Sequence, residues 1–161
     1  MIDLTHLHPM VVHFPIALLL VGFSTDLAGL IIKREFLSQA AFYLLILGAL
    51  GTIAALMSGE QAGDGITEQG LLKQAVEQHE EAAELAVWLV GITTAVRIIL
   101  VVLKKYSGIL KVMAFLLFFA SVIAIVRTGY YGGALVYEHA AGVQFNLGSD
   151  LYTLPGQGDD N

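Results

Sequence analysis

The sequence contains no cysteine. This excludes disulfide bonds, thiolate nucleophiles, iron–sulfur clusters and the C-x-x-C-H attachment of c-type haem. Any haem would have to be held without a covalent bond to the chain. Any metal ion would need ligands from histidine, aspartate, glutamate or methionine.

Charged residues are also scarce, at 14% of 161 residues against 57% hydrophobic ones, and the mean hydropathy is +0.75. A soluble domain usually carries about 25% charged residues. The net charge of −6 argues against nucleic-acid binding. No Ser-His-Asp set, P-loop or dinucleotide fingerprint is present, which disfavours a hydrolase or a kinase. We therefore expect a membrane protein.

Four long apolar segments account for the excess of hydrophobic residues. Each is close to the roughly 20 residues that cross a hydrocarbon core, and lipid requires every backbone group to be satisfied within the segment. We therefore predict a single all-α domain over residues 1–161, a four-transmembrane-helix bundle, with a polar tail at 144–161. The expected spans are 10–32, 36–57, 82–103 and 109–131.

Basic residues predict the orientation of this bundle. The two short loops hold Lys33, Arg34, Lys104, Lys105 and Lys111. The middle loop, Gly59–Glu81, has one basic residue, Lys73, among six acidic ones. Positive-inside reasoning places the short loops in the cytoplasm and both termini outside. The N-terminus lacks a basic n-region, so we do not interpret it as a cleaved signal peptide.

All five histidines fall on the outward side of the predicted topology: His6, His8, His13, His79 and His139. Neutral imidazole is the commonest metal ligand and the usual axial ligand of b-type haem. His13 and His79 lie at comparable depth, to within about two turns, and form the first predicted pair. His8 and His139 are the second candidates. The alternative is an interfacial rim of solvated histidines, which is the simpler interpretation of His6.

The stretch "HPMVVHFP" (His8–Pro15) opens the first apolar segment. Pro9 fits the first turn of a helix, where its missing N–H is tolerated. Pro15 cannot bond the carbonyl of Val11 and should bend the helix, turning His13 toward the bundle axis. Alternatively, both prolines only shape the helix end.

Three residues in or just after the fourth segment complete the candidate site. Arg127 reaches the outward level and could bind a haem propionate, or could be a rim arginine solvated by headgroups. Gly132 and Gly133 would allow close approach to a flat ligand. A helix break at these glycines would fold His139 back over the site.

Two further charges lie inside the apolar segments. Asp26 and Arg97 are each six residues from the cytoplasmic ends of the first and third spans. Equal depth predicts an ion pair, because pairing lowers the cost of an intramembrane charge. A proton path or a quinone contact is the alternative interpretation.

The motifs "HPMVVHFPIAL", the His79 segment and "TGYYGGALVYEHAAGV" resemble a family of bacterial four-helix membrane proteins, domain of unknown function 2231. The resemblance covers nearly the whole chain and highlights His8, His13, His79 and His139. Ala140 departs from it, because many members have glycine there. The resemblance implies a fold similar to b-type membrane cytochromes, association with c-type cytochromes, and a multi-pass location in the bacterial inner membrane.

Three functions follow as hypotheses. The first is electron transfer by haem b bound near the periplasmic face, with quinol as a possible donor, in an electron carrier or redox subunit rather than a stand-alone enzyme. The second is a non-haem site for Cu, Fe or Zn. The third is a cofactor-free subunit of a larger membrane complex. The partners expected are membrane lipid, quinol, c-type cytochromes, and a second copy of the chain or a redox complex.

Overall fold

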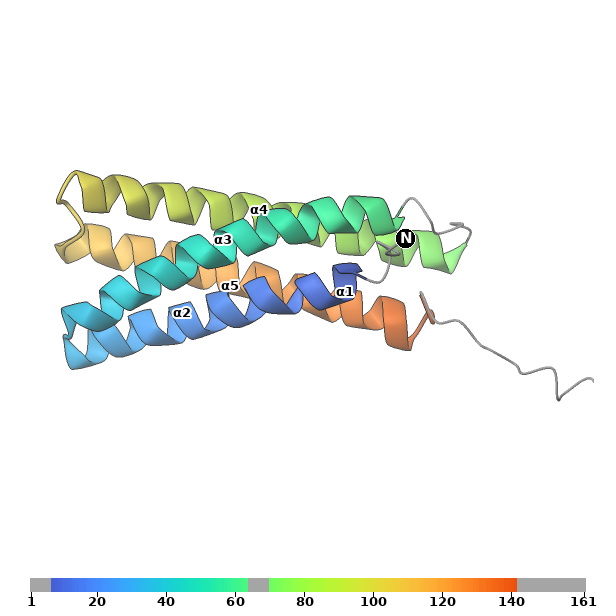
Figure 1. The fold of residues 1–161 in the computed structure, drawn as a ribbon, viewed down its shortest axis with the longest axis horizontal. Helices are drawn as coiled ribbons and strands as arrows, with labels where there is room; N and C mark the ends of the chain where they lie inside the picture. The colour runs from blue at the N-terminus through green and yellow to red at the C-terminus, as the bar shows by residue number, and fades with distance from the viewer. Residues whose placement is uncertain (1–6, 64–69, 142–161) are drawn as a thin grey trace, which may run out of the picture.

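The computed structural model describes residues 7–63 and 70–141 (Figure 1). His6 and the polar tail at 144–161 lie outside these residues. Within them the chain is helical and contains no strand, which confirms the all-α prediction. The helices are α1 (Leu7–Val11), α2 (His13–Ile32), α3 (Glu35–Gly63), α4 (Leu71–Val102) and α5 (Gly108–Tyr137).

The described residues contain four segments that are long and apolar enough to cross a membrane: His8–Ile32, Glu35–Glu60, Leu71–Val102 and Gly108–Tyr137. Large hydrophobic side chains cover the outside of the bundle. Phe36 is 76% exposed and Trp88 is 64% exposed. An exposed apolar surface of this extent is suited to lipid rather than to water.

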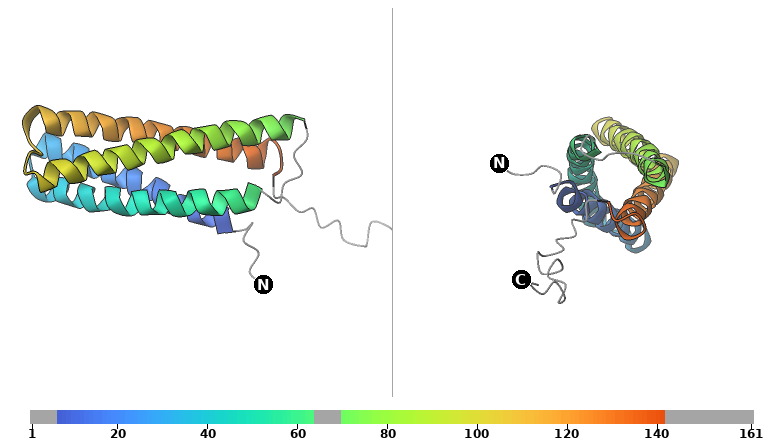
Figure 2. Two further views of the ribbon diagram at one scale, coloured as in Figure 1. Left: turned by 90° about the horizontal axis from the view of Figure 1, so that it is seen from above. Right: turned by 90° about the vertical axis from the view of Figure 1, so that its right-hand side faces the viewer.

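The four long helices form a ring of two hairpins, α2–α3 and α4–α5 (Figure 2). Each helix packs on its two neighbours, and the short α1 packs on α2 and α3. The two short loops lie at one end of the bundle, which we call the loop end (Figure 1). The start of α1, the end of α3, the start of α4 and the end of α5 lie at the other, which we call the histidine end. The positive-inside rule predicts that the histidine end faces outward.

Glycines let the helices of the first hairpin approach closely. A Cβ added at Gly48 on α3 would stand 2.7 Å from Cδ2 of Leu19 on α2, which is fully buried. On the second hairpin the Thr93 and Ser121 hydroxyls hydrogen-bond at 2.8 Å. Small residues and short polar side chains thus hold each hairpin together, as is common where lipid supplies no hydrophobic driving force.

Two helix boundaries differ from the sequence-based expectations. The first span is interrupted at Val12, one turn before Pro15, so that His8 and His13 lie on separate helices. The expected break at Gly132 and Gly133 is wrong, because α5 continues through both to Tyr137. Neighbouring turns satisfy the backbone there, and glycine is tolerated within membrane helices.

Candidate functional site

The structure brings His8 of α1 and His79 of α4 together at the histidine end. Their ring centroids are 6.4 Å apart, and the ring planes meet at 76°. His13 is not part of this pair. It is exposed, and its Nδ1 contacts the carbonyl of Pro9 one turn earlier. The first predicted pair, His13 with His79, is therefore corrected to His8 with His79. Five residues separate His13 from His8, which turns the two side chains roughly 140° apart around the helix axis.

The His8 ring is held by the last turns of α3. Its Nδ1 lies 3.1 Å from the carbonyl oxygen of Ala55 and 3.0 Å from Oγ of Ser58. A carbonyl oxygen can only accept a hydrogen bond, so Nδ1 carries the proton that is donated to Ala55. In the neutral ring, Nε2 then keeps its lone pair and can bind a metal.

The His79 ring is held in the same way by α5. Its Nδ1 donates to the carbonyl of Thr128 at 3.2 Å. The Thr128 hydroxyl in turn donates to the carbonyl of Ala82 at 2.9 Å, which fixes α5 against α4 at this level. Each histidine thus binds a neighbouring helix through Nδ1. This is the usual way in which a protein orients an imidazole that ligates a metal through Nε2.

A glycine lies beside each of the two imidazoles. A Cβ added at Gly59 would stand 3.0 Å from Cε1 of His8, and one added at Gly132 would stand 3.1 Å from Cε1 of His79. Gly133, the other predicted glycine, has open space around it. The side chain of any larger residue at Gly59 or Gly132 would press on a ring, so both positions favour glycine.

Sequence reasoning missed Ser58 and Gly59, because the second span is expected to end at residue 57 and the middle loop to begin at Gly59. Instead α3 continues to Gly63. The available signal was the small-residue series Gly48, Gly51 and Ala55 on α3, which continues at helical spacing to Ser58 and Gly59.

The other predicted residues lie apart from the histidine pair. Arg127 is exposed on α5, with its guanidinium 5.4 Å from the centre of the Tyr131 ring. His139 is half-buried just beyond the end of α5. Among residues 7–63 and 70–141, no group of three or more His, Asp or Glu side chains is placed to hold a metal ion. In that part of the chain the candidate site consists of two imidazoles.

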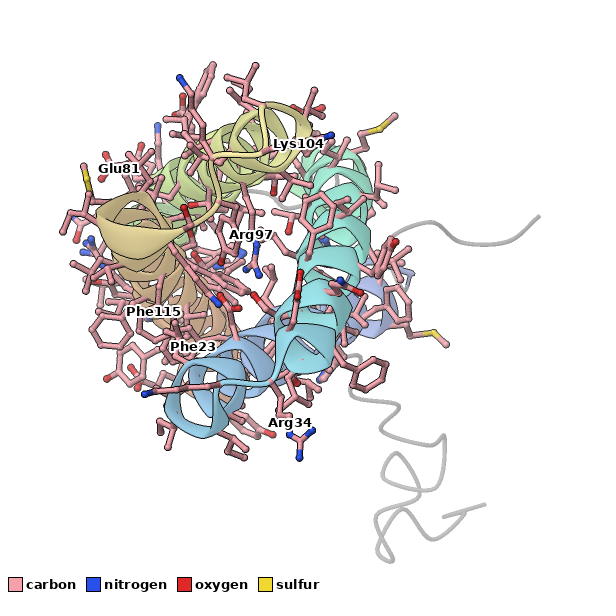
Figure 3. All side chains as sticks on the ribbon, turned by 90° about the vertical axis from the view of Figure 1, so that its left-hand side faces the viewer. Phe23, Arg34, Glu81, Arg97, Lys104 and Phe115 are labelled. Carbon is pink, nitrogen blue, oxygen red and sulfur yellow. The ribbon has the colours of Figure 1, made fainter. Side chains whose placement is uncertain are left out.

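The predicted ion pair between Asp26 and Arg97 is confirmed toward the loop end. The two terminal nitrogens of Arg97 donate to the two carboxylate oxygens of Asp26 at 2.8 and 2.9 Å. One of these nitrogens also donates to the backbone carbonyl of Ser38 at 2.8 Å. Both charged side chains are almost completely buried, and Arg97 lies within the ring of helices (Figure 3).

Tyr106, in the loop between α4 and α5, covers this ion pair. Its ring lies 4.9 Å from the Arg97 guanidinium, and its hydroxyl donates to Asp26 at 3.5 Å. Burial raises the pKa of Tyr106 above that of a free tyrosine. The phenol therefore stays protonated near neutral pH and remains a hydrogen-bond donor.

The fold and the apolar surface define the class as a four-helix membrane protein. A family model described as "Predicted membrane protein (DUF2231)" matches residues 5–145, and the chain belongs to this family. No curated protein and no solved structure matches the chain. The comparisons therefore give no support to the expected similarity to b-type cytochromes.

Proposed function

We propose that this protein binds haem b between His8 and His79 near the outward face of the membrane and transfers electrons. The observation that carries the proposal is the pair of imidazoles anchored through Nδ1, with ring centroids 6.4 Å apart. Two metal–nitrogen bonds of about 2 Å each, together with the ring radii, require a centroid separation of roughly 6 Å. The pair therefore has the spacing to share one metal atom.

The small number of protein donors favours haem over a bare metal ion. Structural sites for zinc take four protein ligands, and copper and non-haem iron sites usually take three or more. The described residues offer two imidazoles at this site, without a third His, Asp or Glu. A porphyrin supplies four nitrogens of its own, so two axial imidazoles are sufficient. This argument ranks haem b above Cu, Fe or Zn.

Two histidine ligands would fill both axial positions of the iron, which favours electron transfer over oxygen chemistry. The role of the chain is to orient the rings through Ala55 and Thr128 and to keep the site between helices α3, α4 and α5. As an electron carrier or redox subunit of a bacterial inner membrane, the protein would accept electrons from quinol and pass them to a c-type cytochrome. A homo-oligomer or a larger redox complex fits the same role.

A reduced-minus-oxidised optical spectrum of the purified protein tests this proposal. We expect a strong Soret band and a sharp reduced α-band in the wild type. His8→Ala and His79→Ala should each remove the sharp reduced α-band, which requires both imidazole ligands. His13→Ala is the matched control, because His13 is exposed and lies outside the pair; it should leave the bands unchanged.

A colourless protein that takes up no added haem would refute haem binding and favour a cofactor-free subunit. Metal retained without haem bands would favour the Cu, Fe or Zn alternative. Equal loss of the bands in His13→Ala would contradict the assignment of ligands.

A further inference from the structure

A cavity opens at the loop end of the bundle, opposite the histidines. Its volume is about 600 Å³. Four cationic residues line it near the membrane surface: Lys33, Arg34, Lys104 and Lys111. Glu35 is the one acidic residue of its lining. Arg97 also lines it, and its charge is balanced by Asp26. The cavity therefore carries an excess of positive charge.

The buried guanidinium leaves one donor of the cavity lining unused. Both terminal nitrogens of Arg97 are engaged by Asp26 and Ser38. Its Nε is buried without a hydrogen-bond partner among the described residues, although Arg97 is only 1% exposed. A buried donor without a partner is costly and is rare in native structures. The cavity lining thus includes a cationic side chain with one donor that the described residues leave unpaired.

The lining also has an apolar part. Leu30, Phe42 and Val101 line the cavity. Ile31 and Val102, which follow two of these residues in the sequence, are each 71% exposed. A free phosphate would fill only a small part of the volume and would leave these surfaces uncovered. A ligand with an anionic head and hydrocarbon chains matches both parts of the cavity.

We propose that this cavity binds the phosphate group of an anionic membrane phospholipid. Positive-inside reasoning places the cavity at the cytoplasmic leaflet, where basic pockets between helices attract anionic headgroups. The lysines and Arg34 attract the phosphodiester, and the apolar rim contacts the acyl chains. Inorganic phosphate shares the same anionic chemistry and is the competing source. The proposal does not depend on haem binding, because it uses none of the histidines.

Native mass spectrometry of the full chain in detergent tests this proposal with three probes: palmitoyl-oleoyl phosphatidylglycerol, palmitoyl-oleoyl phosphatidylcholine and inorganic phosphate. We expect one phosphatidylglycerol to be retained at least 10-fold more tightly than phosphatidylcholine, with a preference that weakens in high salt. Inorganic phosphate should not displace it at millimolar concentration.

Lysine substitutions locate the lipid. Lys104→Gln and Lys111→Gln should each weaken phosphatidylglycerol binding about 5-fold. The electrostatic attraction between one lysine and an anionic membrane surface changes the affinity by about this factor. Lys105→Gln is the matched control, because Lys105 is exposed in the same loop but does not line the cavity. It should change binding less than 2-fold. The remaining basic residues of both loops preserve the orientation in each variant.

Equal retention of the two lipids would overturn the proposal. So would an effect of Lys105→Gln as large as that of Lys111→Gln. If inorganic phosphate bound through Lys104 and Lys111 and phosphatidylglycerol were not preferred, the cavity would be a phosphate site. The lipid proposal would then be wrong.

Discussion

Asp26 and Arg97 are the most completely enclosed charges that the structure describes, and each is stable there only because of the other. Their two-point hydrogen bonding and the bond to the Ser38 carbonyl satisfy the carboxylate and both terminal nitrogens. Asp26 lies on α2 and Arg97 on α4, so this pair joins the two hairpins. At the residue scale we therefore treat it as structural.

Removing one partner of this pair should be more harmful than removing both. Asp26→Ala leaves a buried, uncompensated guanidinium and should lower the free energy of unfolding by about 3–5 kcal/mol. Asp26→Leu combined with Arg97→Met should lower it by much less, because no buried charge remains. Unfolding in mixed detergent with increasing SDS measures both. A double variant as unstable as Asp26→Ala would contradict this account.

The glycine beside His79 provides a second test at the residue scale. Gly132→Ala places a methyl group 3.1 Å from Cε1 of His79 and should displace the ring by a few tenths of an ångström. We expect weaker haem retention, because axial ligation depends on the position of Nε2. Gly133→Ala meets open space and is the matched control. Titration with haem measures the affinity of each variant. Equal affinities would show that a methyl group at position 132 does not displace the His79 ring.

At the scale of whole elements, the end of α5 contains a residue with an unfavourable backbone conformation. Ala140 has a φ of 51°, a left-handed conformation in which a Cβ is unfavourable. Just beyond it, the N–H of Ala141 bonds the carbonyl of Leu135 at 3.0 Å and closes the helix end. Glycine has no Cβ and adopts this conformation without strain.

Ala140→Gly should therefore stabilise the end of α5 by about 1–2 kcal/mol. Hydrogen exchange of the amides from Glu138 to Ala141 should become slower, while exchange in the middle of α5 should not change. Faster exchange at the end of α5 would show that Ala140 is not strained.

The helices themselves were the most predictable elements. The length of the apolar segments alone indicates four spans. Counting residues from the cytoplasmic ends of the first and third spans places Asp26 and Arg97 at the same depth. The histidine pair was less predictable. His8 and His13 point to different sides of the first span, and the apolar pattern does not show which of the two faces α4. His8 then packs on Ser58 and Gly59, a contact that depends on α3 extending beyond its apolar part.

For the whole molecule, the distribution of charge predicts which end faces the cytoplasm. The loop end carries Lys33, Arg34, Lys104 and Lys105, and the histidine end carries mainly acidic residues. The orientation predicted from charge places the proposed lipid cavity on the cytoplasmic side of the membrane and the histidine pair on the opposite side.

The absence of cysteine makes this topology directly measurable. A membrane-impermeant maleimide should label Glu80→Cys in intact spheroplasts and should label Ser107→Cys only after lysis. Both residues are exposed, and neither substitution changes a basic residue. The reverse pattern of labelling would place the histidines in the cytoplasm and contradict the predicted orientation.

The electron paramagnetic resonance spectrum of the oxidised protein tests the central claim most directly, because it reports the axial ligands of a haem iron. The account predicts a low-spin ferric signal for the wild type and for His13→Ala, and its loss or replacement by a high-spin signal in His8→Ala and His79→Ala. A wild-type protein without a low-spin haem signal, or a His8→Ala variant that keeps it, would contradict the claim that these two imidazoles share one haem.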